Sequence, residues 1–131
     1  MPLSDANLRY LFAVSDLAAG GRPVRSKEVA DVLGVTRPSV VRVLRTLAEH
    51  GLVEKAPYGK ITLTERGRFA ARYYRNLVER INGDFPSTGL ELTPAQRWQA
   101  SLVLAAALPD TEYLRRCPPA LKTPEGSGCE A

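Results

Sequence analysis

The stretch SKEVADVLGVTRPSVVRVLRTLAEHGLVEKAPYGKITLTERG, residues 26–67, decides the fold of this chain. Its hydrophobic spacing predicts two helices separated by a sharp turn at Gly34, then a β-hairpin with a Tyr-Gly tip, then the start of a third helix. This order is typical of a winged helix-turn-helix, in which the second helix enters the major groove of DNA. The expected fold class is therefore mainly α with a small β-hairpin.

Local signals give the boundaries within this stretch. Ser26 is expected to cap the first of the two helices, and Gly34 to end it, because so sharp a turn needs a residue with positive φ. Thr36 is expected to cap the second helix, whose first turn tolerates Pro38. The hairpin strands are expected at 52–55 and 60–63, with the turn between them.

Further helices are expected on both sides of this core. A helix from about residue 5 to 19 should precede it, joined by a short extended link at 22–25. A long helix over 65–82, capped by Thr64, should follow. After it, a helix over 94–108 and a short helix ending near 116 are expected. The predicted domains are a winged helix-turn-helix (1–64), a long helix with a helical dimerisation region (65–116) and a flexible tail (117–131).

Positive charge is concentrated on the predicted helix-turn-helix and wing. Residues 22–75 contain twelve Lys or Arg and five Asp or Glu, a net charge of +7, whereas the whole chain carries +4. A phosphate backbone attracts such a surface. The chain shows no secretory signal, no apolar stretch long enough to cross a bilayer and only two cysteines, so a cytoplasmic location is expected.

The candidate DNA-binding residues lie on three neighbouring segments. Arg42, one turn into the second helix, can reach base edges, because Arg is the usual bidentate partner of guanine. Hydroxyls at the start of that helix suit phosphate oxygens, and basic residues near the preceding helix and in the wing suit the DNA backbone. The set comprises Arg25, Lys27, Thr36, Arg37, Pro38, Ser39, Val41, Arg42, Arg45, Tyr58 and Lys60.

Two apolar members of this set have an alternative interpretation. Pro38 and Val41 lie on a face that should meet water; contact with thymine methyls would explain them, but single exposed apolar residues are also common. Further candidates for phosphate contacts are Arg22, Lys55, Arg66 and Arg68. Each of these, taken singly, is equally well explained as a solvated surface charge.

Residues 24–74 resemble the N-terminal domain of the DtxR/MntR family of metal-dependent (iron or manganese) transcriptional repressors. The Pro-Ser-Val of the second helix, the Tyr-Gly wing tip and the LTERG start of the long helix carry the resemblance, which covers roughly residues 5–82. It implies a homodimeric repressor that reads a near-palindromic operator with the helix at 37–50. The helix-turn-helix part alone also resembles MarR-type regulators, which respond to small molecules.

The same resemblance implies Mn²⁺ or Fe²⁺ between the first helix, the long helix and the helix after it. The corresponding positions are Arg9, Phe12, Val78 and residues 96–100, which offer no set of oxygen or imidazole ligands. A divalent metal is therefore expected by family analogy alone, and no cofactor is assigned. Cys117 and Cys129 form a weak alternative site for a soft metal, haem or an oxidant.

The long helix and the helix after it carry more apolar surface than the DNA-binding part can cover. A homodimer built on these helices would bury the excess and place the two reading helices about 34 Å apart. Folding of both helices onto their own domain is the alternative. An effector, if one exists, could contact Tyr73, Tyr74 and Trp98, although such residues are more often core.

Two classes of function remain open. The first is a dimeric sequence-specific transcriptional regulator, whose partners are double-stranded DNA and a second copy of the chain, with no membrane. The second is a winged-helix module that binds proteins and does not read DNA. The concentrated basic charge favours the first. An enzyme is not expected, because the sequence has no nucleophile–base pair, phosphate-binding loop or metal-ligand cluster.

Overall fold

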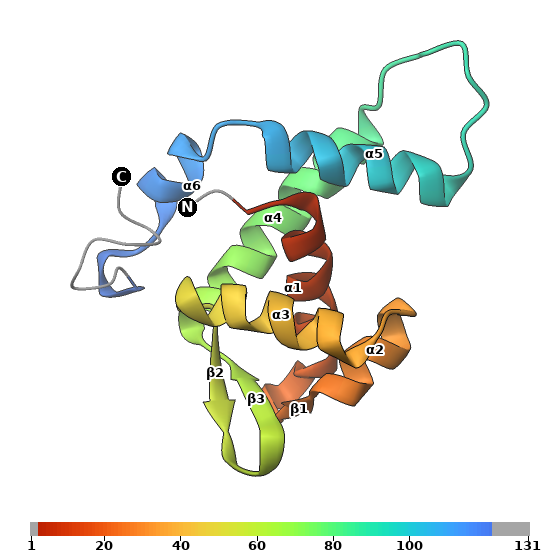
Figure 1. Cartoon of the computed structure of the whole chain (residues 1–131). Coiled ribbons are helices and arrows are strands. Elements are labelled where there is room, and N and C mark those ends of the chain that lie inside the picture. The colour runs from red at the N-terminus through yellow and green to blue at the C-terminus, as the bar shows by residue number, and fades with distance from the viewer. Residues whose placement is uncertain (1–2, 122–131) are drawn as a thin grey trace.

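Helices dominate the computed structural model, which describes residues 3–121. The predicted fold class is confirmed, with a small sheet set among the helices (Figure 1). None of the helices within residues 3–121 has the length and apolar character needed to cross a membrane. The element order is α1 (Asp5–Leu17), β1 (Val24–Arg25), α2 (Ser26–Leu33), α3 (Arg37–Glu49), β2 (Val53–Ala56), β3 (Lys60–Leu63), α4 (Glu65–Gly83), α5 (Pro94–Ala107) and α6 (Thr111–Arg116).

The sheet has three strands, whereas the sequence predicted a two-stranded hairpin. β2 and β3 pair antiparallel, and β1 adds to the other edge of β3 with Val24 opposite Ile61. The segment 22–25, expected to be a link, is therefore partly a strand, because its extended backbone lies beside an open sheet edge. Since β1 leads directly into α2, the wing and the helix-turn-helix are joined by backbone hydrogen bonds.

The start of α2 lies one residue from the predicted cap. Arg25, in place of Ser26, holds the cap position, and its N–H donates to the Glu28 carboxylate at 3.0 Å. Glu28 also accepts from Arg22, and the hydrogen bonds from Arg22 and the Arg25 backbone hold the pKa of this carboxyl below its ordinary value. Arg22, a candidate phosphate contact, is therefore paired within the protein.

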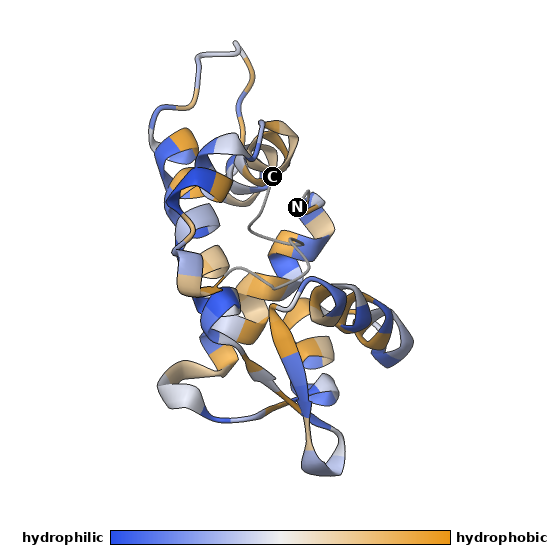
Figure 2. Ribbon diagram, turned by 90° about the vertical axis from the view of Figure 1, so that its left-hand side faces the viewer, coloured by the Kyte–Doolittle hydropathy of each residue, from blue (hydrophilic) through white to orange (hydrophobic). Residues whose placement is uncertain are grey.

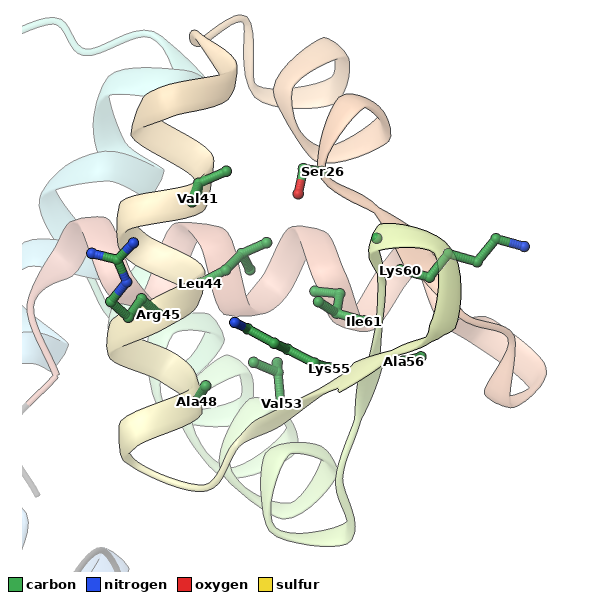
Figure 3. Close-up of a pocket in the computed structure, with 11 residues that line it drawn as sticks. Ser26, Val41, Leu44, Arg45, Ala48, Val53, Lys55, Ala56, Lys60 and Ile61 are labelled. Carbon is green, nitrogen blue, oxygen red and sulfur yellow. The ribbon is translucent and has the colours of Figure 1, made fainter.

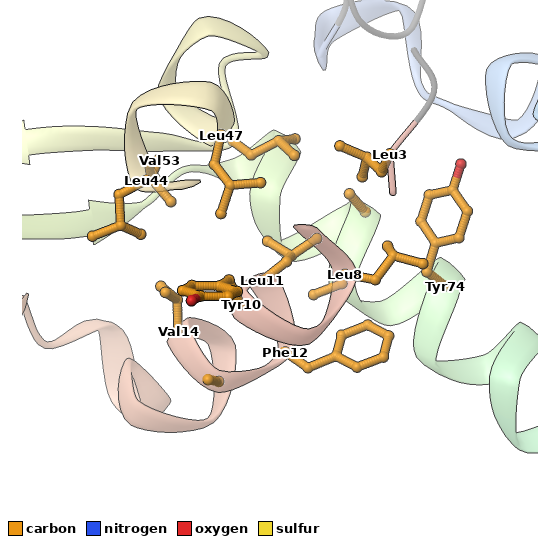
Figure 4. Close-up of a cluster of buried hydrophobic side chains, with 14 of the residues drawn as sticks. Leu3, Leu8, Tyr10, Leu11, Phe12, Val14, Leu44, Leu47, Val53 and Tyr74 are labelled. Carbon is orange, nitrogen blue, oxygen red and sulfur yellow. The ribbon is translucent and has the colours of Figure 1, made fainter. Parts of the chain in front are cut away.

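The core is built around α1, which packs against α2, α3, α4 and α5. Leu8 and Leu11 of α1 are fully buried, and Figure 4 shows them in a cluster with Leu44 and Leu47 of α3 and Tyr74 of α4. Figure 2 shows hydrophobic and hydrophilic residues alternating along the helices, as expected for amphipathic helices around a shared core. This packing fixes which side of α3 faces outward.

Thr64 fixes the wing to α4. Its hydroxyl oxygen accepts from the N–H of Gly67 at 2.9 Å and so caps the helix, as predicted. The same oxygen lies 2.7 Å from the carbonyl oxygen of Gly51 and 3.0 Å from that of Leu52. One side chain therefore joins the end of β3, the start of the wing and the first turn of α4.

The C-terminal helices pack onto the same body. Leu102 of α5 is fully buried. Tyr113 of α6 is fully buried among aromatic rings of α4, with ring-centroid distances of 5.6 Å to Phe69, 5.3 Å to Tyr73 and 5.2 Å to Tyr74. Burial raises the pKa of Tyr113 to about 12. Residues 122–131, most of the predicted tail, lie outside the described residues.

Candidate nucleic-acid interface

The first turn of α3 is open to solvent at Arg37 and Pro38. Thr36 caps the helix: its hydroxyl accepts from the N–H of Ser39 at 3.3 Å and donates to the Ser39 hydroxyl at 2.9 Å. The Thr36 hydroxyl is therefore used in the cap both as acceptor and as donor. The proton of the Ser39 hydroxyl takes no part in the cap. Of the two predicted phosphate-binding hydroxyls, Ser39 is the better donor.

Val41, Arg42 and Arg45 lie exposed on the outward side of α3, and Val41 is 45% exposed. The opposite side is the buried stripe of Val40, Leu44 and Leu47. Helical spacing of the buried residues therefore turns the three predicted contacts toward solvent. This is the face that would meet a major groove.

Arg25 and Lys60 lie directly opposite each other in the β1–β3 pair. Side chains at such positions have Cβ atoms roughly 4.5–5.5 Å apart, and like charges there are destabilising. Among the salt bridges within residues 3–121, none includes either cation. A phosphate bound between the two side chains would relieve their repulsion.

The wing tip carries Tyr58 in a left-handed backbone conformation, with φ of 64°, and its side chain is 95% exposed. A residue with a Cβ in this region costs roughly 1–2 kcal/mol, and such strain tends to gather at functional sites. The wing projects away from the helical body (Figure 1). The structure therefore presents an aromatic ring at the far end of a basic hairpin.

Lys55, one of the further candidates for phosphate contacts, also belongs to this surface. Its side chain extends from β2 toward α3, whereas Lys60 points away from that helix (Figure 3). Strand alternation explains this orientation: Lys55 lies two residues after buried Val53 and opposite buried Ile61, so all three share the face toward α3. A basic residue at that register reaches α3.

Arg66 does not belong to this surface, and its expected role as a phosphate contact is wrong. The side chain is 7% exposed and donates to the backbone carbonyl oxygens of His50, at 3.1 Å, and Leu121, at 2.7 Å. Arg68 is exposed and pairs with Glu65 at 2.9 Å. Of the two basic residues at the start of α4, Arg66 therefore serves the fold.

The predicted residues fall into three groups. Val41, Arg45 and Lys60 line a groove of about 370 Å³ between α3 and the wing, together with Lys55. The β1–β3 pair places Arg25 beside Lys60, and Lys27 is exposed in the first turn of α2. The remaining members, which do not line the groove, lie on α3, at its cap or at the wing tip: Thr36, Arg37, Pro38, Ser39, Arg42 and Tyr58.

The junction of α1, α4 and α5 does not fit the Mn²⁺ or Fe²⁺ that the resemblance implies. The Arg75 guanidinium lies 4.7 Å from the centre of the Phe12 ring and donates to the Asp16 carboxylate at 3.0 Å and to the Phe12 carbonyl at 3.2 Å. Its charge repels a cation. No group of three or more His, Cys, Asp or Glu side chains within residues 3–121 could hold a metal ion.

The predicted effector pocket is not assembled either. Tyr73 lines a cavity between α4 and α6. Trp98 lines a different cavity, which lies among α1, α2, α4 and α5. The three aromatic residues therefore do not share one effector pocket. Cys117 is buried and its thiol is not free, and Cys129 lies outside the described residues.

Comparison with known proteins identifies similar regulators. The family model described as the HVO_A0261 N-terminal domain matches residues 13–84, which include every element from α2 to α4. The transcriptional regulator MntR of Escherichia coli O6:H1 and that of Escherichia coli O157:H7 are each 35% identical to the chain over 66 residues. These residues make up 50% of the chain and 43% of each regulator, so the match spans less than half of the relatives' length.

Proposed function

The chain belongs to the HVO_A0261 N-terminal domain family, and from its winged-helix fold and basic face we propose that it is a DNA-binding transcriptional regulator. The observation that carries the proposal is the Arg25–Lys60 pair, a repulsive arrangement that a polyanion stabilises. The net charge of +7 on residues 22–75 supports it over a wider surface. The partial similarity to two transcriptional regulators agrees with it.

In this proposal α3 enters the major groove. Arg42 contacts a base edge from the middle of the exposed face, while Arg37 and the Ser39 hydroxyl contact phosphates or bases near the helix start. Arg25 and Lys60 hold one phosphate between them, and Tyr58 lies along the neighbouring backbone. Lys27 contacts the phosphates from the start of α2.

We further infer a homodimer formed through α5. Val103, Leu104 and Leu108 are 45%, 44% and 42% exposed on or next to this helix, and Leu90 in the preceding loop is 71% exposed. Exposed aliphatic residues on one helix are a usual mark of association. A two-fold axis through α5 would place two copies of α3 on successive major grooves of a near-palindromic operator. Operator occupancy would then cause repression.

Selection of preferred sites from random duplex DNA, followed by titration of the full chain, tests the function. We expect a preferred sequence bound roughly 10³-fold or more tightly than random DNA. Affinity should fall steeply between about 50 and 200 mM salt, because phosphate contacts release counterions. Binding without sequence preference, or no binding, would favour the protein-interaction alternative.

Sedimentation of two variants tests the dimer. Leu104→Glu places a charge on the exposed face of α5 and should leave a folded monomer with weakened operator binding. Arg72→Glu changes an exposed residue of α4, outside the proposed interface, and should remain dimeric. A wild-type chain that sediments as a monomer when bound to its operator would refute the dimer and leave DNA binding intact.

A further inference from the structure

The groove between α3 and the wing has an apolar lining that phosphate contacts do not explain. Its volume of about 370 Å³ falls within the range of small-molecule sites, which are mostly apolar with a few polar groups. Aliphatic side chains come from both sides, Val41, Leu44 and Ala48 from α3 and Val53 and Ile61 from the sheet (Figure 3). A DNA phosphate gains nothing from contact with such a lining.

Cations border this apolar groove, and no acidic residue lines it. Lys55 extends from β2 across the space toward α3, and Arg45 lies on the α3 side (Figure 3). Both side chains are exposed, and among the salt bridges within residues 3–121 neither takes part. The groove therefore combines a hydrophobic interior with positive charge at its edge.

We propose that this groove binds a small amphipathic anion, a carboxylate on an aliphatic or aromatic body, and that this ligand and DNA exclude each other. The body lies against Val41 and Ala48, and the carboxylate meets the Lys55 ammonium, an arrangement that satisfies both features of the groove. The exclusion rests on the proposed function, because Val41 and Arg45 belong to the face of α3 that would enter the major groove.

Decanoate and decanol are suitable probes, since they share a chain length and differ in charge. Titration into the full chain, followed by methyl NMR, should show saturable decanoate binding with shifts at Val41, Ala48 and Ile61. Decanol should bind about tenfold more weakly, because it lacks the charge that Lys55 recognises. Absence of saturable binding, or shifts confined to residues outside the groove, would overturn the proposal.

A pair of charge-removing variants locates the anion. Lys55→Gln should weaken decanoate about tenfold and leave decanol unchanged, because only the carboxylate loses its partner. Arg97→Gln removes an exposed charge on α5, away from the groove, and should change neither affinity. If the two substitutions weakened decanoate affinity equally, overall charge alone would explain the binding, and the proposed site would be refuted.

Competition with the selected operator tests the exclusion. Decanoate should displace labelled DNA in proportion to its occupancy of the groove, and decanol at the same concentration should not. Unchanged DNA affinity with decanoate bound would refute the exclusion. If the chain binds no DNA, the proposed function fails, whereas the decanoate titration and the Lys55→Gln variant still decide whether the groove is an anion site.

Discussion

The guanidinium of Arg66, near the start of α4, donates to the backbone carbonyl oxygen of His50 at 3.1 Å, where α3 ends. Carbonyl groups at the end of a helix lack partners, and the helix dipole favours a cation there. A second N–H of the same side chain donates to the carbonyl oxygen of Leu121, 55 positions along the chain. One buried cation therefore connects α3, α4 and the segment after α6.

Replacing this cation should destabilise the fold. Arg66→Met removes the donor for two carbonyl groups and should lower the free energy of unfolding by roughly 1–3 kcal/mol. Arg72→Met, an exposed position of the same helix, should change it by less than about 0.5 kcal/mol. Urea denaturation followed by circular dichroism measures both. Equal losses in the two variants would contradict a specific role for Arg66.

Gly67 should tolerate no side chain. A Cβ at this position would overlap the carbonyl oxygen of Leu52 and lie 2.7 Å from Cδ1 of Leu63. Gly67→Ala must therefore push the wing away from α4, and we expect a loss of roughly 1–3 kcal/mol in thermal or urea unfolding. Gly83→Ala, in the same helix with nothing within 4 Å, should be neutral or stabilising by up to about 1 kcal/mol. A stable Gly67→Ala protein would argue against the close approach.

The Arg25–Lys60 pair should lower the stability of the free protein and strengthen its binding to DNA. Lys60→Gln removes one of two facing charges and should raise the free energy of unfolding by roughly 0.2–1 kcal/mol. The same variant should bind DNA with a slope of log affinity against log salt that is about 0.9 less steep, one phosphate contact having been lost. An unchanged slope would show that the pair holds no phosphate, and a loss of stability would show that the two charges do not repel each other in the free protein.

Arg42 should determine one position of the operator. If its guanidinium contacts a guanine, Arg42→Ala costs roughly 1–3 kcal/mol on the preferred site and relaxes specificity at a single base pair. Titration against the operator and its single-base variants measures this. Weakening that is uniform across all sequences would instead make Arg42 a phosphate contact.

His50, the single histidine of the chain, should make stability depend on pH. Burial is the main cause that lowers its pKa in the folded protein, with Glu49 acting in the opposite direction. The unfolded chain therefore binds a proton more readily, so the contribution of His50 is complete above about pH 6.5 and is lost as pH falls through the lower folded pKa.

Unfolding by urea at about pH 7.5 and about pH 5 measures this contribution. His50→Gln should lose less stability than the wild type between these two values, because the glutamine side chain does not titrate. Identical losses of stability in the variant and the wild type would show that carboxylates, and not His50, cause the pH dependence.

Local signals allowed much of the fold to be predicted. The caps at Thr36 and Thr64 and the left-handed turn at Gly34, with φ of 66°, depend on a few neighbouring residues. β1 escaped prediction because two residues carry no periodicity and their pairing depends on the distant β3. The burial of Arg66 is likewise a tertiary effect, since its partners lie at positions 50 and 121.

The candidate site was predicted to a similar degree. Helical spacing separates Val41, Arg42 and Arg45 from the buried side of α3, so their exposure follows from the sequence. The position of Arg25 directly opposite Lys60 could not be predicted, because it depends on the register of the β1–β3 pair, which the sequence does not reveal.

The ladder between β1 and β3 limits how this protein can be re-engineered. A wing grafted from another winged-helix protein as residues 53–63 alone would leave Val24 and Arg25 behind, facing a strand selected for a different neighbour. Specificity chimeras should therefore exchange the residues before α2 together with the hairpin. In protein design terms, the smallest transferable wing is discontinuous in sequence, because it includes the residues of β1 immediately before α2.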